Sequence, residues 1–370
     1  MKISTIIDEK ERRVAVTPET VKKYIGLGLQ VVLPENIGVK AGFPDDEYAS
    51  AGAVIAKTKF VADADFYVCI KPSFLAMEDF EPCFKFDLDF KFKAGSHLIG
   101  ILSPFQHEKS LEKLSTAGVN CYALELIPRI TRAQSMDVLS SQSNIAGYRA
   151  VLEALHLYGR VVPLMMTAAG TVRPAKILVL GAGVAGLQAI ATAKRLGAVV
   201  SAFDVRSAAQ EQVESLGATF ISVEASDSGE TAAGYAKEMD DDYKKRQAEK
   251  LAQTIAKMDI VITTAQIPGK PAPRLVDEAM VKSMKSGSVI VDMATESGGN
   301  CAMSKKNEVV QINGVSIIGY TDLAAGVAQD ASQLFARNAF NFVALMIKDG
   351  NVDTSDAIVQ ATLLKKLSGA

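Results

Sequence analysis

The 370-residue sequence predicts an α/β fold with two Rossmann-like domains on parallel sheets, joined by long helices. Three observations lead to this prediction. The length suits two domains, because domains usually contain about 100–200 residues. Short apolar runs alternate with segments of helical periodicity along most of the chain, as in βαβ units. A glycine motif follows one of these apolar runs near the middle of the chain, which is where a Rossmann domain would place it.

The composition is that of a globular protein. Hydrophobic residues make up 48% of the sequence and charged residues 22%, and the net charge of −2 gives no reason to expect nucleic-acid binding. The charged opening lacks the apolar core of a secretion signal, and no apolar run approaches the roughly 20 residues that span a membrane. The four cysteines are scattered without metal-ligand spacing, which indicates reduced thiols, no metal site and a cytoplasmic protein.

Strands and helices are expected to alternate in the N-terminal third of the chain. Thr17 followed by Pro18 has the pattern of a helix N-cap and first position, and glycines end that helix after residue 25. Residues 74–93, rich in phenylalanine and charge, are expected to form an irregular connection. Similar patterns predict further helices over 45–52 and 108–117, and strands over 3–7, 30–33, 66–70, 98–102 and 120–124.

The remainder of the chain begins with a long apolar-periodic segment, residues 138–166, which predicts a helix joining the two domains. A final helix over 328–348 is expected to fold back on the N-terminal domain. Strands are expected over 177–180, 199–203, 219–223, 260–264, 288–293 and 315–318. The predicted domains are therefore 1–137 plus 327–370, and a nucleotide-binding domain over 138–326.

The glycine motif offers a distinct role for each of its glycines. Gly181 permits a tight turn, Gly183 lets the backbone approach a pyrophosphate, and Gly186 lets the following helix pack close to the sheet. The helix that starts near Val184 directs unpaired N–H groups at an anion. Such glycines alone are a weak signal, but a strand before them, a helix after them and a second strand ending at Asp204 complete the dinucleotide fingerprint.

Asp204 favours NAD(H) over NADP(H) as the bound nucleotide. Its carboxylate can accept hydrogen bonds from both hydroxyls of the adenosine ribose and would repel a 2′-phosphate. Arg206 leaves the other possibility open, because a nearby arginine can accommodate a 2′-phosphate. The polar segment 226–250 is either a solvated loop leading into an exposed helix or a mobile lid beside the cofactor site.

Several longer blocks resemble one family over nearly the whole chain: the NAD(H)-binding domain, carried by the alpha subunit, of proton-translocating NAD(P) transhydrogenase. They are residues 126–137 (LIPRITRAQSMD), 139–144 (LSSQSN), 186–198 (GLQAIATAKRLGA), 211–217 (EQVESLG), 234–239 (GYAKEM), 267–273 (IPGKPAP) and 298–301 (GGNC). Residues 12–18 (RRVAVTP) also resemble alanine dehydrogenase, a relative of the same fold.

The resemblance implies a homodimer whose subunits hold NAD(H) in the cleft between two domains. It further implies two partners, an NADP(H)-binding subunit or domain and a membrane-spanning subunit that conducts protons. Hydride would pass directly from NADH to NADP⁺ on the partner. Such a chain would sit at the cytoplasmic face of the inner membrane, attached through these partners.

The resemblance also implies roles for individual residues. Those expected at the nicotinamide end, where hydride transfer takes place, are Arg129, Gln134, Asp137, Ser140 and Tyr235. Those expected to bind the nucleotide are Gly181, Gly183, Val184, Gly186, Asp204, Val205, Arg206, Gly234, Gln247 and Gln266. Gly234 and Tyr235 match the tip of a mobile loop that closes over the nucleotide, with Gln247 at its far end. At Gln266 the chain departs from the family, which usually has an apolar residue there.

The segment from Arg129 to Ser140 has two interpretations. As a nicotinamide pocket, Arg129 and Gln134 bind the carboxamide and its pyrophosphate side, and Asp137 orients one of them. As a polar interdomain linker, it needs Asp137 and Ser140 only as helix caps.

Two other functions stay open, a free-standing alanine or 2-oxo-acid dehydrogenase and a regulatory module that senses NADH without turnover. A dehydrogenase of that kind must move a proton, usually with histidine or lysine. Where alanine dehydrogenases have their catalytic histidine, this chain has Ser103, and its three histidines lie elsewhere. Lys71 and Arg13 match substrate-contacting positions of that relative, although we favour a strand-end lysine and a surface arginine. Hydride transfer between two nicotinamides needs no such proton, only positioning and exclusion of water.

Overall fold

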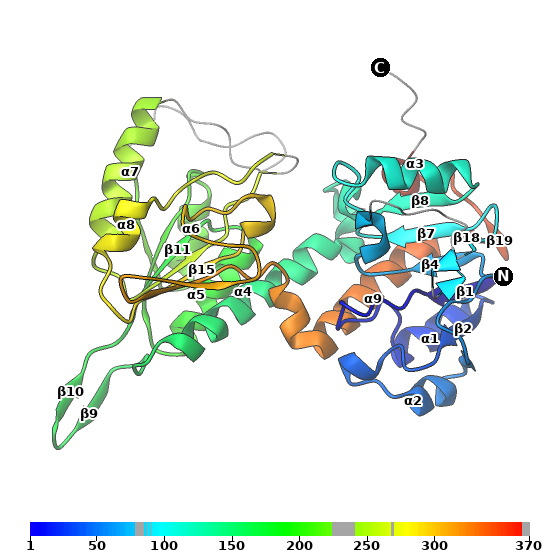
Figure 1. Cartoon of the computed structure of the whole chain (residues 1–370), viewed down its shortest axis with the longest axis horizontal. Helices are drawn as coiled ribbons and strands as arrows, with labels where there is room; N and C mark the ends of the chain where they lie inside the picture. The colour runs from blue at the N-terminus through cyan, green and yellow to red at the C-terminus, as the bar shows by residue number, and fades with distance from the viewer. Residues whose placement is uncertain (78–84, 87, 90, 224–240, 268–269, 365–370) are drawn as a thin grey trace. The chain divides into compact units, whose positions relative to one another are not determined.

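The computed structural model describes residues 1–77, 85–86, 88–89, 91–223, 241–267 and 270–364, which fold into two compact α/β units (Figure 1). The first unit comprises Met1–Gln142 and Ala325–Ala370, and the second comprises Ser143–Ala324. Two Rossmann-like units on largely parallel sheets confirm the predicted fold class. The domain limits predicted from the sequence lie close to these boundaries and remain a prediction.

The first unit is built on a six-stranded parallel sheet with the order β3-β2-β1-β4-β7-β8. Its strands are β1 (Lys2–Thr5), β2 (Gln30–Pro34), β3 (Val54–Ala56), β4 (Phe66–Val68), β7 (His97–Gly100) and β8 (Asn120–Ala123). All of them except β3 were predicted, with ends that differ by one or two residues. The short edge strand β3 escaped prediction because its three residues are exposed or half-buried and show no alternation.

The helices of the first unit begin where the sequence predicts. In α1 (Pro18–Gly26), the backbone N–H of Thr17 donates to the hydroxyl of Thr20 at 2.9 Å, so a polar side chain caps the helix start. The predicted α2 (Asp45–Ser50) and α3 (Glu108–Thr116) are also present. Among the described residues between β4 and β7, the elements are a short 3₁₀ helix, η2 (Ser73–Ala76), and the two-residue strands β5 (Lys85–Phe86) and β6 (Leu88–Asp89), which fits the irregular connection expected there.

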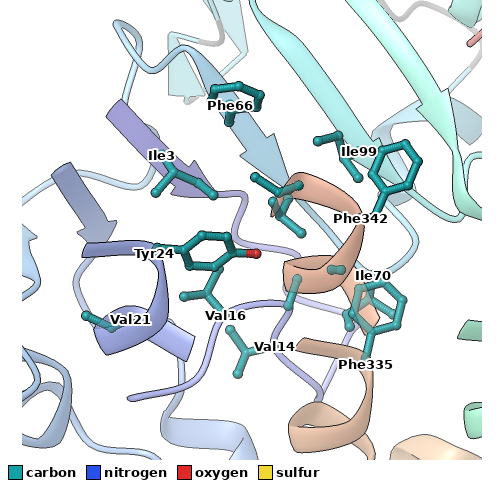
Figure 2. Close-up of a cluster of buried hydrophobic side chains, with 14 of the residues drawn as sticks. Ile3, Val14, Val16, Val21, Tyr24, Phe66, Ile70, Ile99, Phe335 and Phe342 are labelled. Carbon is teal, nitrogen blue, oxygen red and sulfur yellow. The ribbon is translucent and has the colours of Figure 1, made fainter. Parts of the chain in front are cut away.

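The final long helix, α9 (Ala328–Leu345), contributes to the core of the first unit. Phe335 and Phe342 of α9 are fully buried with Ile3 of β1 and Tyr24 of α1 (Figure 2). Burial of these two aromatic side chains stabilises the fold by about 25 cal/mol for each Å² of apolar surface removed from water. The helix is therefore part of the first unit although it follows the second in sequence.

The second unit is built on a seven-stranded sheet with the order β13-β12-β11-β14-β15-β17-β16. Its strands are β11 (Lys176–Leu180), β12 (Val199–Phe203), β13 (Thr219–Phe220), β14 (Ile260–Thr263), β15 (Val289–Asp292), β16 (Val309–Ile312) and β17 (Val315–Ile318). All pair in parallel except β16, which runs antiparallel to β17 at the sheet edge. The edge strand β16 was not among the strands predicted from the sequence. Asn313 and Gly314 form the connecting turn with φ of 49° and 76°, as asparagine–glycine hairpins do.

Alternating residues of β11 face two different cores. Ile177 and Val179 pack in one cluster, and Leu178 and Leu180 in another on the opposite face. A strand buried on both faces lies inside a sheet covered by helices on both sides, as predicted. The covering helices include α5 (Val184–Arg195), α6 (Ala209–Ser215), α7 (Asp241–Ile255) and α8 (Glu278–Ser283).

The helix that crosses the unit boundary, α4 (Val138–Leu157), is shorter than the predicted 138–166. Gly159 and Pro163 follow its end, and the apolar run beyond them forms a β-hairpin, β9 (Met165–Thr167) with β10 (Gly170–Val172). This hairpin extends away from the sheet of the second unit (Figure 1). The final helix also ends earlier than predicted, at Leu345. Within the stretches of chain that the structure describes, no helix is long and apolar enough to cross a lipid bilayer.

Candidate functional site

The glycine turn lies at the topological switch point of the second sheet. The chain passes from β11 outward to β12 and β13, then returns to β14 on the other side of β11. In open α/β sheets, ligands bind at the carboxyl ends of the strands where the order reverses. Gly181 follows β11 directly, and α5 begins three residues later at Val184. The predicted dinucleotide motif therefore occupies the place where such a site is expected.

The three motif glycines differ in what surrounds them. Gly181 has φ of +100°, a conformation that side chains disfavour, and a Cβ on Gly186 would lie 1.8 Å from the carbonyl oxygen of Gly181. A Cβ on Gly183 would meet no described atom within 4 Å. Gly181 and Gly186 are thus required by the local fold, whereas Gly183 leaves open space beside the start of α5. This combination fits a backbone that a pyrophosphate approaches closely.

Asp204, directly after β12, is held in place by its neighbours. Its carboxylate accepts hydrogen bonds from the backbone N–H of Ala182 at 2.7 Å and from Nε and Nη2 of Arg206, both at 2.9 Å. The Asp204 side chain is only 6% exposed. The structure therefore brings Asp204, Arg206 and the glycine turn together, and Val205 lies between the first two. It also pairs the Arg206 guanidinium with a carboxylate, so a 2′-phosphate would have to compete for it.

The other residues predicted to bind the nucleotide differ in exposure, and some lie outside the described residues. Gln266 follows β14 with an exposed side chain whose Nε2 donates to the carbonyl of Met293 at 3.2 Å. Gln247 is buried within α7. Gly234 and Tyr235 lie outside the described residues, as does most of the predicted lid.

The predicted nicotinamide residues other than Tyr235 lie together in the first unit, on and beside the 3₁₀ helix η4 (Thr131–Met136). Arg129 and Gln134 are exposed. The Asp137 carboxylate accepts from the backbone N–H of Ser140 at 2.9 Å and from its hydroxyl at 2.6 Å, which is the geometry of an N-cap on α4. The capping interpretation is thus present in the structure, and orientation of Gln134 or Arg129 by Asp137 remains a prediction.

Two asparagines of α9 hold this segment, and no sequence pattern points to them. Nδ2 of Asn338 and Nδ2 of Asn341 donate to the same carbonyl, that of Ser135, at 2.8 and 3.0 Å. Asn338 also accepts from the hydroxyl of Ser141 at 2.7 Å. The backbone beside Gln134 is therefore fixed by a helix that follows it by some two hundred residues.

The first unit also contains a cavity of about 350 Å³. Arg13 and Lys71 both line it. Arg13 is only 8% exposed, and it pairs with Glu11 at 2.7 Å and donates to Oε1 of Gln142 at 2.7 Å. The surface position that we favoured for Arg13 is therefore wrong, because these partners compensate the burial of its charge.

No histidine is found among the described residues that line this cavity. Ser103, shortly after β7, has φ of 48°, and its backbone N–H donates to the carboxylate of Glu125. His97 is buried within β7 and stacks on Phe66 at 4.9 Å, and burial lowers its pKa. Within the described ranges, no group of three or more residues is arranged to hold a metal ion.

The chain is similar to known proteins along almost its whole length. Residues 4–146 match the family described as "Alanine dehydrogenase/PNT, N-terminal domain", and residues 150–368 match "Alanine dehydrogenase/PNT, C-terminal domain". The first part of NAD(P) transhydrogenase subunit alpha from Rhodospirillum rubrum is 51% identical over 337 residues, which cover 90% of this chain and 86% of that protein. Alanine dehydrogenase 1 of Staphylococcus aureus is 27% identical over 347 residues, which cover 91% of this chain and 84% of that protein. The crystal structure of transhydrogenase from Sinorhizobium meliloti has a TM-score of 0.87 at 45% identity, covering 98% of both chains.

Proposed function

The chain belongs to the alanine dehydrogenase/PNT family, and from this premise we propose that it is the NAD(H)-binding subunit of a proton-translocating NAD(P) transhydrogenase. The observation that supports binding most directly is the open space at Gly183, beside a turn that Gly181 and Gly186 require. Asp204 at the end of the next strand supports NAD(H) as the nucleotide. The high identity to named transhydrogenase subunits supports an oxidoreductase of this kind.

In this proposal the protein's own residues bind and orient the nucleotide. The turn and the N-terminus of α5 hold the pyrophosphate, and Asp204 holds the adenosine ribose. Bound NADH supplies a hydride for NADP⁺ on a partner. Because neither reacting carbon needs a proton, the contribution of Arg129, Gln134, Asp137, Ser140 and Tyr235 is positioning and exclusion of water.

We propose two partners of different chemistry, an NADP(H)-binding subunit and a membrane-spanning subunit that conducts protons. The chain would join the cytoplasmic face of the inner membrane through them. It would be catalytically complete only in that assembly.

A homodimer is the proposed oligomeric state, and the β9–β10 hairpin is its candidate contact. Met166 in β9 is 78% exposed and Leu164, directly before β9, is 57% exposed, which is unusual for apolar side chains. Sedimentation of the wild-type chain should give a dimer, and Met166→Lys should raise its dissociation constant. A wild-type monomer at micromolar concentration would refute the dimer.

Reconstitution with partner subunits tests the proposed activity. The purified chain mixed with NADH and an NADP(H)-binding subunit should reduce an NADP⁺ analogue. Arg129→Ala should slow this transfer and leave the melting temperature unchanged, because Arg129 is exposed. Arg160→Ala, at another exposed arginine, is the matched control. An unchanged rate of hydride transfer in Arg129→Ala would show that Arg129 does not contribute to the site.

A free-standing alanine or 2-oxo-acid dehydrogenase is the second candidate function, and the cavity lined by Arg13 and Lys71 favours it. Both cations suit a substrate carboxylate. The chain alone with NADH, pyruvate and ammonium would then turn over without a partner. NADH binding without turnover in either mixture would instead indicate a module that senses NADH.

A further inference from the structure

Two loops meet at the switch point of the second sheet, and Thr264 ties them together. It follows β14, and its hydroxyl donates to the carbonyl of Gly181, which follows β11, at 2.9 Å. Its backbone N–H donates to the carbonyl of Leu180 at 2.8 Å. The glycine turn is thus fixed to the first residue of the loop after β14.

Asn300 holds two further residues of that loop, Ala265 and Pro273. Its side chain is fully buried, and its Oδ1 accepts from the backbone N–H of Ala265 at 3.0 Å. Its Nδ2 donates to the carbonyls of Ala265 and Pro273, both at 2.8 Å. Both donors and the acceptor of the amide are used, which fixes its orientation and clamps the two ends of the segment 265–273.

Asp292 in turn fixes the backbone beside Asn300. Its buried carboxylate accepts from the backbone N–H of Cys301 at 2.9 Å, from the hydroxyl of Ser304 at 2.6 Å and from the hydroxyl of Thr263 at 3.1 Å. A buried carboxylate with this many donors is compensated and rigid. The ends of β14 and β15 are thereby joined into one hydrogen-bonded network.

We propose that Thr264 and Asn300 are positioning residues for opposite halves of the dinucleotide, an inference that rests on the proposed function. Asp204 lies on the β12 side of β11, and the loop after β14 lies on the other side. A dinucleotide crossing the switch point with its adenosine ribose at Asp204 extends its nicotinamide toward the β14 side. Thr264 therefore fixes the turn for the adenosine and pyrophosphate half, and Asn300 fixes the loop for the nicotinamide half.

Binding of NADH and of ADP-ribose, which lacks nicotinamide, separates the two roles. Asn300→Ala leaves three backbone groups without their partner and frees the loop. It is expected to raise the Kd for NADH about tenfold and to change that for ADP-ribose less than about twofold. Thr264→Val is expected to raise both dissociation constants by the same factor. If the role of Asn300 is purely structural, Asn300→Ala should leave the ratio of the Kd for NADH to the Kd for ADP-ribose unchanged.

A matched control is Ser316→Ala in β17, which removes a buried hydroxyl that accepts from Gln311 at 2.8 Å in the same unit. It should leave both dissociation constants unchanged. Should Asn300→Ala not fold, Asn300→Asp, which keeps an acceptor for the N–H of Ala265 but removes both Nδ2 donors, gives the same test, with a selective loss of NADH expected. Equal effects on NADH and ADP-ribose in either variant would overturn the inference. A wild-type chain that binds neither ligand would instead refute the proposed function.

Discussion

Alanine is expected to have different effects at two glycines of the motif. Gly186→Ala should lower the thermal stability, and Gly183→Ala should weaken nucleotide binding. A Cβ at Gly186 would lie 1.8 Å from the carbonyl oxygen of Gly181, whereas a Cβ at Gly183 would have no described atom within 4 Å. Because nonbonded atoms sit about 3.5 Å apart, Gly186→Ala forces the turn or α5 to move by about 1.7 Å. That movement is resisted, since the N–H of Gly181 donates to the carbonyl of Phe203 at 2.8 Å and its carbonyl accepts from Thr264.

The size of the difference follows from this geometry. Overpacking usually costs about 1–3 kcal/mol, and the backbone clash at Gly186 places that substitution at the upper end. At about 2–4 °C for each kcal/mol in a unit of this size, Gly186→Ala should lower Tm by about 6–12 °C. Gly183 has φ of −76° and ψ of −167°, which alanine also adopts. Gly183→Ala should therefore change Tm by less than about 2 °C.

Nucleotide binding, in contrast to Tm, should be affected by Gly183→Ala. The Cβ of Gly183→Ala fills the space that a pyrophosphate would enter, so its Kd for NADH should rise at least about tenfold, or 1.4 kcal/mol. Thermal unfolding and titration of NADH fluorescence measure the two effects on the same samples. Wild-type NADH affinity in Gly183→Ala would refute the placement of the nucleotide. An unchanged Tm in Gly186→Ala would refute the packing argument.

Three further predictions follow from single contacts. Asp204→Asn removes the charge that repels a 2′-phosphate and loosens its pair with Arg206, so the ratio of Kd for NADPH to Kd for NADH should fall at least about tenfold in parallel titrations. Tyr24→Phe removes a buried hydroxyl that has no hydrogen-bond partner among the described residues, and urea unfolding should show a gain of about 1 kcal/mol. Burial lowers the pKa of His97 although the Asp65 carboxylate opposes this, so the unfolded chain takes up the proton first. The free energy of unfolding should therefore fall as pH drops below the unfolded value of about 6.5, and His97→Phe should remove that part of the dependence. A flat profile in the wild type would contradict this assignment.

The sequence predicted those features that depend on neighbours along the chain. The Thr17–Pro18 helix start, the glycine turn and the buried strands all carry local patterns, and each is present. The errors came from patterns that fit two structures. The apolar residues after Gly159 fit a longer α4 by periodicity, but they belong to an exposed hairpin. The Asn313–Gly314 pair is a local hairpin signal that the predicted set of strands does not include.

Residues whose importance depends on topology carry no such signal. Thr264 contacts Gly181 because β14 lies next to β11 in the sheet. More than eighty residues separate the two positions in the sequence, so the sequence alone does not reveal this contact. Asn338 supports η4 in the same way across the whole second unit. A single threonine or asparagine in a loop has no periodicity to recognise, so such positions become visible only in three dimensions.

The first unit bears on the choice between the proposed transhydrogenase subunit and a free-standing dehydrogenase. The first unit retains a cavity with Arg13 and Lys71, but the loop after β7 carries Ser103, whose backbone is bound by Glu125. Burial raises the pKa of Glu125, yet its oxygens are occupied by backbone N–H groups and are not directed at a substrate proton. An enzyme that reduces a carbonyl cannot omit the proton donor, whereas a hydride relay between two nicotinamides can. A cavity with no histidine among its described lining residues, together with the glycine turn and Asp204, therefore favours the proposed transhydrogenase subunit, and we expect partner-free pyruvate reduction to require more than the two cations Arg13 and Lys71.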